Sequence, residues 1–453
     1  MPVNRLLLNM AVPMIVSMLV QALYNVVDSV FVAKLSEDAL NAVSLAFPVQ
    51  NLMISVGVGT GVGINALLSR SLGQKEQDKV DRTAMNGLLL AAISCLVFMI
   101  FGLTCGRRFY AIQTDIQTIV HYGGDYLTIC CGMCFGMFAQ ITLERILQAT
   151  GRTFYTMITQ ATGAIINIIL DPILIFGLFG FPALGVVGAG IATSLSRFVE
   201  FVIVVSGAHR SAERYPFMEG VFRNFHIDGN LARQVAIKGF PLLLNECLWS
   251  MSQAMLLQCY SVRGIQAIAA MNITNTITQI FNEVFLSLGN ATAILVGQEL
   301  GASRMTGARR TAWRMITLSV SSCAVMGTLL ALFSPLIPHI YNTEPAIREL
   351  ASSVIRTAAL CMPLFAFANA AYFTLRSGGK TLITFFFDSC YTWLINFPIA
   401  FVLSRYTALP LPIVYLFVNG VDLLKCIIGF ILVKKGVWVN NIVASSQDVP
   451  QAD

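Results

Sequence analysis

Two aspartates inside apolar stretches have the clearest potential for chemistry in this sequence. Asp28 follows Asn25 by three positions and Asp171 follows Asn167 by four, so each carboxylate shares a helical face with an amide. An ionisable side chain at the centre of a membrane helix costs about 2.5 to 3.5 kcal/mol on insertion scales, so residues of this kind are functional candidates by default. The pattern predicts that Asp28 and Asp171 bind an ion.

The two aspartates are expected to lie close together. Their apolar stretches cross the membrane in the same direction under the topology given below, and both residues fall in the last third of their stretch. Pro172 cannot donate a backbone hydrogen bond, so it loosens the helix beside Asp171. Two carboxylates in a poorly hydrated cavity are hard to ionise together, which makes the pair an acceptor for a proton or for sodium. The alternative is that each carboxylate only caps or bonds a neighbouring helix.

The second half of the chain carries weaker candidates of the same kind. Glu246, Glu283, Asp388 and Asp422 all lie within apolar stretches. Glu246 is expected to face a central cavity and to attract cations there. Asp422 precedes Lys425 by three positions, a spacing that places both on one helical face and predicts an internal ion pair.

The elements that position these residues are predicted to be membrane-spanning helices. Of the 453 residues, 56% are apolar and only 11% are charged, and the mean hydropathy is +0.73. Apolar runs of roughly 20 to 28 residues, long enough to cross a hydrocarbon layer of about 30 Å, recur along the whole chain. We expect an all-α membrane protein with about 12 spans, at Leu6 to Lys34, Val43 to Leu68, Thr83 to Cys105, Ile119 to Gln148, Tyr155 to Gly177, Ala183 to Gly207, Gln234 to Val262, Gln266 to Gly297, Thr311 to Ser334, Ile347 to Leu375, Leu382 to Leu403 and Leu411 to Val433.

The two halves of the chain are predicted to be copies of one six-helix unit. A fixed shift of 228 positions brings Pro13 onto Pro241 and Gly61 onto Gly289. With six spans per half, both copies have the same orientation, so the pseudo-twofold axis lies along the membrane normal. We therefore expect an N-terminal lobe (1–208), a cytoplasmic linker (209–233), a C-terminal lobe (234–435) and a polar tail (436–453). At this shift Asp28 falls on an apolar leucine, so the acid pair belongs to the first lobe alone.

Basic residues predict the orientation of the chain. Of the 29 Lys and Arg residues, 20 fall on the side that carries the N-terminus, 6 on the other side and 3 within spans. Because cytoplasmic loops collect positive charge, both termini are expected to face the cytoplasm. The net charge of +6 is then a consequence of topology, and nothing in it favours binding of nucleic acid.

Other classes of membrane protein find less support. A membrane-embedded enzyme would show clustered metal ligands or an aspartate-rich motif at the end of a span, whereas the four histidines lie in loops or at span edges. We therefore expect neither an enzyme nor a bound cofactor. A flippase for lipid-linked saccharides remains the closest alternative, but it would need several arginines for a pyrophosphate, and only Arg197, Arg356 and Lys425 lie within spans.

Three segments carry more specific patterns. They are the first span with Pro13, Gln21, Tyr24-Asn25 and Val27-Asp28-Ser29 followed by Ala42 to Pro48, the motif Asn167-x-x-x-Asp171-Pro172, and the stretch from Gly188 to Thr193. Together they resemble the bacterial members of the multidrug and toxic compound extrusion family, and the resemblance in length and duplication covers nearly the whole chain.

The resemblance implies a transporter that exports organic cations in exchange for protons or sodium by alternating access of two lobes. It implies that the ion site of the first lobe comprises Asp28, Asn167, Asp171 and Thr193, with Tyr126 as the matching tyrosine of the fourth span.

The same resemblance implies which residues line the substrate cavity and where the protein is located. Gln21, Tyr24, Glu246 and Glu283 are expected along the substrate cavity. The expected location is the bacterial cytoplasmic membrane, with lipid and a small organic cation as partners and a monomeric chain.

Overall fold

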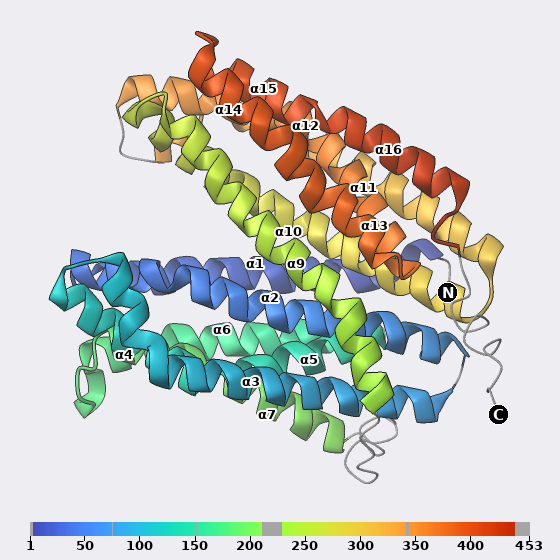
Figure 1. The fold of residues 1–453 in the computed structure, drawn as a ribbon, viewed down its shortest axis with the longest axis horizontal. Coiled ribbons are helices and arrows are strands. Elements are labelled where there is room, and N and C mark those ends of the chain that lie inside the picture. The colour runs from blue at the N-terminus through green and yellow to red at the C-terminus, as the bar shows by residue number, and fades with distance from the viewer. Residues whose placement is uncertain (1–2, 75, 151, 211–228, 341–343, 440–453) are drawn as a thin grey trace. The chain divides into compact units, whose positions relative to one another are not determined.

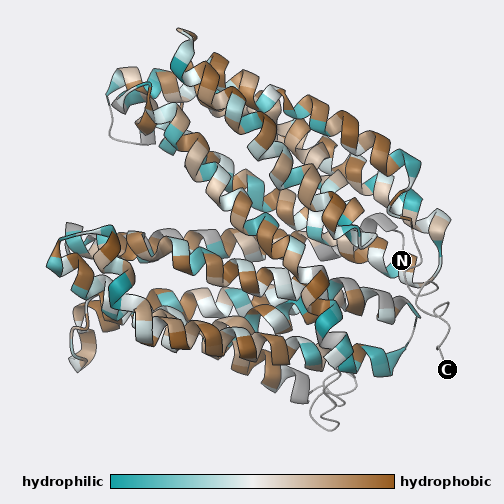
Figure 2. Ribbon diagram, in the orientation of Figure 1, coloured by the Kyte–Doolittle hydropathy of each residue, from teal (hydrophilic) through white to brown (hydrophobic). Residues whose placement is uncertain are grey.

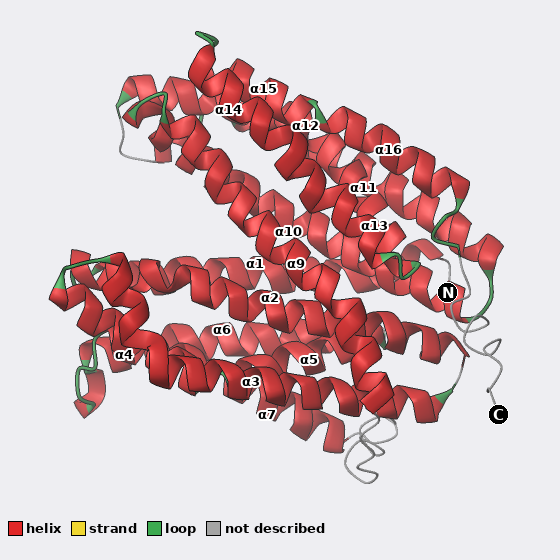
Figure 3. Ribbon diagram, viewed as in Figure 1, coloured by secondary structure: helices red, strands yellow, loops and turns green. Residues whose placement is uncertain are grey.

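The computed structural model is helical throughout the residues that it describes, which are 3–74, 76–150, 152–210, 229–340 and 344–439. These residues contain α-helices, short 3-10 and π-helical turns and connecting loops, and no strand (Figure 3). The chain divides into two compact units, 1–243 and 244–453. Much of the expected linker (209–233) and most of the expected tail (436–453) lie outside the described residues.

The first unit is a bundle of long helices joined by short connections (Figure 1). The helix α1 packs along α6, α2 along α3 and α5, and α7 along α6 and α5. The bounds are α1 (Val3–Ala33), α2 (Glu37–Gln74), α3 (Gln77–Gln113), α4 (Gln117–Gly132), α5 (Phe135–Ala149), α6 (Thr153–Phe176), η1 (Leu178–Gly180) and α7 (Val186–Arg210).

The second unit repeats this order of helices. The helix α12 packs along α10, α11 and α16, and α10 also packs along α11. The bounds are α9 (Gly229–Ser261), α10 (Ile265–Gly301), α11 (Met305–Phe333), η3 (Ile337–Ile340), α12 (Pro345–Ser377), α13 (Thr381–Phe385), η4 (Phe386–Cys390), η5 (Thr392–Asn396), α14 (Phe397–Tyr406), α15 (Leu411–Gly420) and α16 (Asp422–Lys435). The boundary between the two units falls inside α9, because the residues of α9 before 244 belong to the first unit.

Each of the twelve expected spans coincides with a helix or with a run of helices. Nine spans in the described residues are long and apolar enough to cross a membrane, and the bent pair α4 and α5 makes a tenth when counted as one. The other two expected spans are α1, in which the segment Ala11–Gln21 is apolar, and α9. Hydrophobic residues are frequent along all the long helices, as expected for a chain whose solvent is lipid (Figure 2).

Several spans are interrupted, and the sequence predicts only some of the interruptions. Prolines lie inside α1, α2, α6, α9 and α12. The fourth span is broken between α4 and α5 with a bend of 46°. The eleventh span contains two π-helical turns, η4 and η5. Such wide turns inside α-helices frequently occur at functional sites.

The sequence repeat is also visible in the packing within each unit. A Cβ atom at Gly61 would overlap the side chain of Arg145, and one at Gly289 would overlap the ring of Phe373. Both members of the second pair lie 228 positions after those of the first. The two units therefore bring their second and fourth spans into close contact at the same position, which requires a glycine in each.

Arg263 closes the C-terminal end of α14. Its guanidinium donates hydrogen bonds of 2.7 to 2.8 Å to the carbonyl oxygens of Leu403, Ser404, Thr407 and Leu409. The last carbonyls of a helix have no partner inside the helix, so a multidentate donor at this position stabilises the helix end.

Replacing Arg263 with Met should lower the thermal stability of the purified protein. The loss should be at least that of one hydrogen bond to a charged group, about 1.5 to 3 kcal/mol. The matched control is Arg405→Met, because Arg405 is exposed and stacks on Phe401 with 4.3 Å between its guanidinium carbon and the ring centroid. Melting temperatures in detergent that fall equally in both variants would contradict this role.

Candidate functional site

The structure brings the two aspartates of the first unit together. The helix α1 packs along α6, and the carboxyl groups of Asp28 and Asp171 come within hydrogen-bonding reach of each other. Asp171 has no exposed surface. Pro172 follows it inside α6, where the missing backbone donor frees a carbonyl one turn earlier.

Asn167 and Thr193 extend this pair toward α7. The side-chain amide of Asn167 donates to Asp171 Oδ1 over 3.4 Å and to Thr193 Oγ1 over 3.5 Å. Both distances are at the long end for a hydrogen bond, so the amide lies between its two acceptors without binding either tightly. The side chain of Asn25, also expected here, lies outside the described part of the structure.

Tyr126 borders the same region from α4. Its hydroxyl accepts a hydrogen bond of 2.9 Å from Gln50 Nε2, and it lies close enough to Asp28 to interact electrostatically with that carboxylate. Gln50 is a residue that the sequence analysis missed. The available signal was an amide side chain inside an apolar span. To use it, one would have had to know that α2 faces α4 at the depth of Tyr126.

Three oxygens of this site are buried without a hydrogen-bond partner. They are Asp28 Oδ1, Asp171 Oδ2 and Asn167 Oδ1. Unpaired buried acceptors are costly, and a proton or a hard cation bound by oxygen atoms would satisfy them. The donor set of carboxylate, amide and hydroxyl oxygens therefore suits a proton or sodium. The described residues contain no cluster of three or more His, Cys, Asp or Glu suited to a multivalent metal.

Tyr24 belongs to a separate ionic network one helical turn from Asp28. Its hydroxyl bonds the guanidinium of Arg197 over 2.5 Å, and the guanidinium also lies 5.1 Å from the centre of its ring. Arg197 pairs in turn with Glu200, three positions later on α7, at 3.4 Å. Tyr24 is 8% exposed and Glu200 is 2% exposed, so this network lies inside the unit. Gln21, expected along the substrate cavity, is half-buried on α1, the helix that also carries Tyr24.

Arg197→Met should destabilise the protein by about 3 to 5 kcal/mol, because it leaves Glu200 buried without its counter-charge. The double variant Arg197→Met with Glu200→Leu removes both charges and should recover most of that loss. Thermal unfolding of the two purified variants measures the difference. Equal melting temperatures for the single and double variants would show that the ion pair does not hold this region together.

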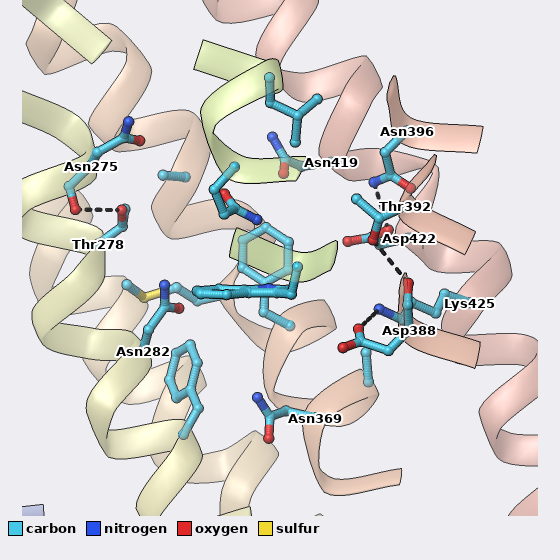
Figure 4. A pocket seen from close by; sticks show the side chains of 18 of the residues that line it. Asn275, Thr278, Asn282, Asn369, Asp388, Thr392, Asn396, Asn419, Asp422 and Lys425 are labelled. Carbon is cyan, nitrogen blue, oxygen red and sulfur yellow. Dashed lines mark hydrogen bonds and ion pairs between the residues drawn. The ribbon is translucent and has the colours of Figure 1, made fainter. Parts of the chain in front are cut away.

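A second polar region lies in the second unit. A cavity of about 270 Å³ is lined by side chains of α9, α10, α12, the eleventh span and the twelfth span (Figure 4). Glu246, which was expected at a central cavity, lines this cavity within the second unit. Glu283 does not line it, although its neighbour Asn282 does.

The charged residues of this cavity are paired differently from the sequence-based expectation. Lys425 binds Asp388 at 2.6 Å, whereas its expected partner Asp422 accepts a hydrogen bond of 3.0 Å from Asn396. The reason is that Asp388 lies on the π-helical turn η4 of the neighbouring span, within reach of the lysine. Spacing along a single helix could not indicate this partner. Asn245 donates to the second oxygen of Asp388 over 3.1 Å.

The two units share one further feature. Ser17 donates a hydrogen bond to Gln160 in the first unit, and Asn245 donates to Asp388 in the second. Both members of the second pair lie 228 positions after those of the first. The first and fifth spans of each unit are thus linked at equivalent positions, with a neutral acceptor in one unit and a carboxylate in the other.

The fold and these sites define a helical membrane transporter of two repeated units. Comparison with known proteins agrees: a model of the MatE family matches residues 13–173 and 241–402. The protein named "Probable multidrug resistance protein YoeA" of Bacillus subtilis is 27% identical over 402 residues, covering 88% of this chain and 86% of that one. The "FAD transporter" of Shewanella oneidensis is 26% identical, covering 77% and 76%. A crystal structure of MATE in complex with MaL6 has a TM-score of 0.89 and 22% identity, covering 96% of each chain.

The chain therefore belongs to the MatE family, the multidrug and toxic compound extrusion transporters that its motifs resemble. Its class is that of a multi-pass membrane transporter and not of an enzyme.

Proposed function

We propose that this protein exports organic cations across the membrane in exchange for protons or sodium, and that Asp28 and Asp171 bind the coupling ion. The observation that supports this proposal most directly is the buried pair of carboxyl groups with unpaired oxygens and no bonded cation among the described residues. A buried site of that kind is stable only when a positive charge neutralises it. The names of relatives such as the Bacillus subtilis protein support a multidrug cargo.

The position of the pair explains how the ion would act on the fold. Asp28 lies on α1, and Asp171 lies on α6 beside Pro172. Neutralisation of either carboxyl removes the repulsion between the two helices and allows them to approach, whereas release of the ion restores the repulsion. A change of this kind favours one of two arrangements of α1, which also contains Pro13. Alternating access then links ion entry from outside to release of the exported cation.

The membrane potential makes such exchange productive. One elementary charge that moves through 100 mV supplies about 2.3 kcal/mol, which corresponds to roughly fiftyfold accumulation. We place both termini in the cytoplasm, because basic residues concentrate on that side of the predicted topology. The resemblance to bacterial members of the family supports a monomer in the bacterial cytoplasmic membrane.

The flippase alternative finds no comparable site. A pyrophosphate would need several available cations. Arg197 is bonded to Tyr24 and Glu200, Lys425 is bonded to Asp388, and Arg356 is exposed and donates to Ser334. Each of these three residues is therefore engaged by a partner within its own unit.

Asp28→Asn should abolish coupled export, because an amide cannot carry the charge that the ion neutralises. The accumulation ratio of a fluorescent organic cation in energised inverted vesicles should fall from about fiftyfold toward unity. Imposed proton and sodium gradients, applied separately to the wild type, identify the coupling ion.

The matched control is Asp78→Asn, since Asp78 is an exposed aspartate that pairs with Arg82 on the surface of α3. Its export should equal that of the wild type. Undiminished gradient-driven export by Asp28→Asn would disprove the assignment of the coupling site.

A further inference from the structure

Five basic side chains from two helices that are far apart in the sequence gather at one end of the second unit. Arg309, Arg310 and Arg314 lie near the start of α11, and Lys434 and Lys435 end α16. All five are exposed, and we call them the basic patch. Both helices are long and apolar enough to span a membrane, so the basic patch lies where two spans reach the membrane surface (Figure 1).

A buried tryptophan holds these two helix ends side by side. The chain leaves α16 at Gly436, whose φ of +71° favours glycine, and turns back toward α11. Trp438 then joins Ala308 and Ala312 of α11 in one apolar cluster and has no exposed surface. A Cβ atom at Gly436 would overlap Nη2 of Arg309, so this guanidinium lies directly against the turn. The arginines of α11 and the lysines of α16 therefore form one continuous surface.

Aromatic rings join the two helices one turn farther into the membrane from Arg309 and Lys434. Trp313 of α11 contacts Phe430 of α16 edge-on, with 5.5 Å between the ring centroids. The ammonium of Lys434 lies 5.8 Å from the centre of the Phe430 ring. Aromatic residues concentrate at the headgroup level of a bilayer, and basic side chains near the end of a span extend toward the surface. This arrangement of charges above rings matches a lipid, whose headgroup lies above its acyl chains.

No described acidic residue neutralises the basic patch. None of its five side chains forms an ion pair with a described residue. Glu299 of α10 approaches the first turn of α11 at Gly307, and it too forms no ion pair with the patch. Like charges that lie close together repel one another, and an anion bound between them relieves the repulsion. The basic patch is therefore suited to an anionic ligand.

The sequence repeat shows that topology alone does not explain this charge. Both units present this corner to the same side of the predicted topology, so the tendency of cytoplasmic loops to collect positive charge acts on both alike. At the shift of 228 positions, the five patch residues correspond to Asp81, Arg82, Asn86, Ser206 and Gly207. Arg82, the one basic residue among them, pairs with Asp78 at 3.0 Å. The excess positive charge is thus specific to the second unit.

We infer that the basic patch binds the headgroup of an acidic phospholipid, in the leaflet that the predicted topology places toward the cytoplasm. The phosphate lies among the arginines of α11 and the lysines of α16, and the first part of the acyl chains contacts Trp313 and Phe430. Arginine binds phosphate through paired N–H groups, and lysine binds it as a point charge. A free phosphate ion would meet the same cations but would gain nothing from the rings. This inference goes beyond the proposed function and does not depend on it.

The direct test measures lipid binding by the purified, delipidated protein. Native mass spectrometry gives the affinities for phosphatidylglycerol, which is anionic, and for phosphatidylethanolamine with the same acyl chains, which has no net charge. Each basic residue near an acidic lipid surface contributes roughly fivefold to binding. The wild type should therefore bind phosphatidylglycerol more tightly by about tenfold or more. Equal affinities for the two lipids would overturn the inference.

Paired variants assign the preference to the basic patch. Arg310→Gln with Lys434→Gln removes one exposed cation from each helix and should weaken phosphatidylglycerol binding by about thirtyfold, leaving phosphatidylethanolamine unchanged. Arg310→Lys with Lys434→Arg keeps both charges and should retain the preference. The matched control, Lys79→Gln with Arg82→Gln, removes the same charge from exposed ion pairs of the first unit and should change neither affinity. Equal losses in the two glutamine variants would overturn the inference, because general surface charge would then hold the lipid.

Thermal unfolding provides a second readout that also checks folding. Without acidic lipid, the wild type and the variant Arg310→Gln with Lys434→Gln should unfold at the same temperature. Phosphatidylglycerol should raise the melting temperature of the wild type more than that of the variant, because a ligand of the native state stabilises it in proportion to its binding. Equal shifts in both proteins would contradict the inference.

The alternative occupant of the basic patch is the C-terminal segment 440–453, which carries Asp448 and Asp453. Deletion of this segment should leave the preference for phosphatidylglycerol as it is in the full chain. A preference that appears only after the deletion would overturn the inference in favour of the protein's own C-terminus.

Discussion

The cost of an ionised side chain in hydrocarbon governs this structure. Within the described spans, most such groups lie beside a specific partner: Arg197 with Glu200, and Lys425 with Asp388. These pairs keep buried charges neutral, and each charge would be expensive alone. The carboxyl groups of Asp28 and Asp171 are different, because they face each other and have unpaired oxygens. This acid pair, which the protein itself leaves unneutralised, is therefore where we propose that the exchangeable ion binds.

The duplicated scaffold supports a different chemistry in each unit. Lys425 lies 228 positions after Arg197, so each unit has one basic residue at an equivalent place in its sixth span. Arg197 is neutralised by Glu200 on its own helix, and no basic side chain among the described residues forms an ion pair with the acid pair of the first unit. Lys425 is neutralised by Asp388 on the neighbouring span, whereas Asp422 accepts a hydrogen bond from the amide of Asn396. In the first unit the acid partner therefore lies on the same helix as the basic residue. In the second unit it lies on the neighbouring span, and both members of the ion pair line the cavity.

The sequence predicts the scaffold well and the cavity poorly, for a physical reason. Apolar runs must be helical in lipid, because every backbone polar group needs an internal partner, so all twelve expected spans coincide with helices. The approach of Asp28 to Asp171 followed from their depth in parallel spans. The partner of Lys425 could not be predicted in this way, because the π-helical turn η4, which carries Asp388, has no signature in hydropathy. The sequence analysis also missed the amide side chains that line the cavity of the second unit. They are isolated residues on five different spans, and only tertiary packing brings them together.

The claim that the acid pair holds the coupling ion is tested most directly by ion release. Purified protein in nanodiscs, in weakly buffered solution, is mixed with an organic cation that it exports, and protons are followed with a pH indicator and sodium with a radioactive tracer. The account predicts that the wild type releases one of the two ions on binding the cation and that Asp171→Asn, which still binds the cation, releases neither. Equal ion release from both proteins would contradict it.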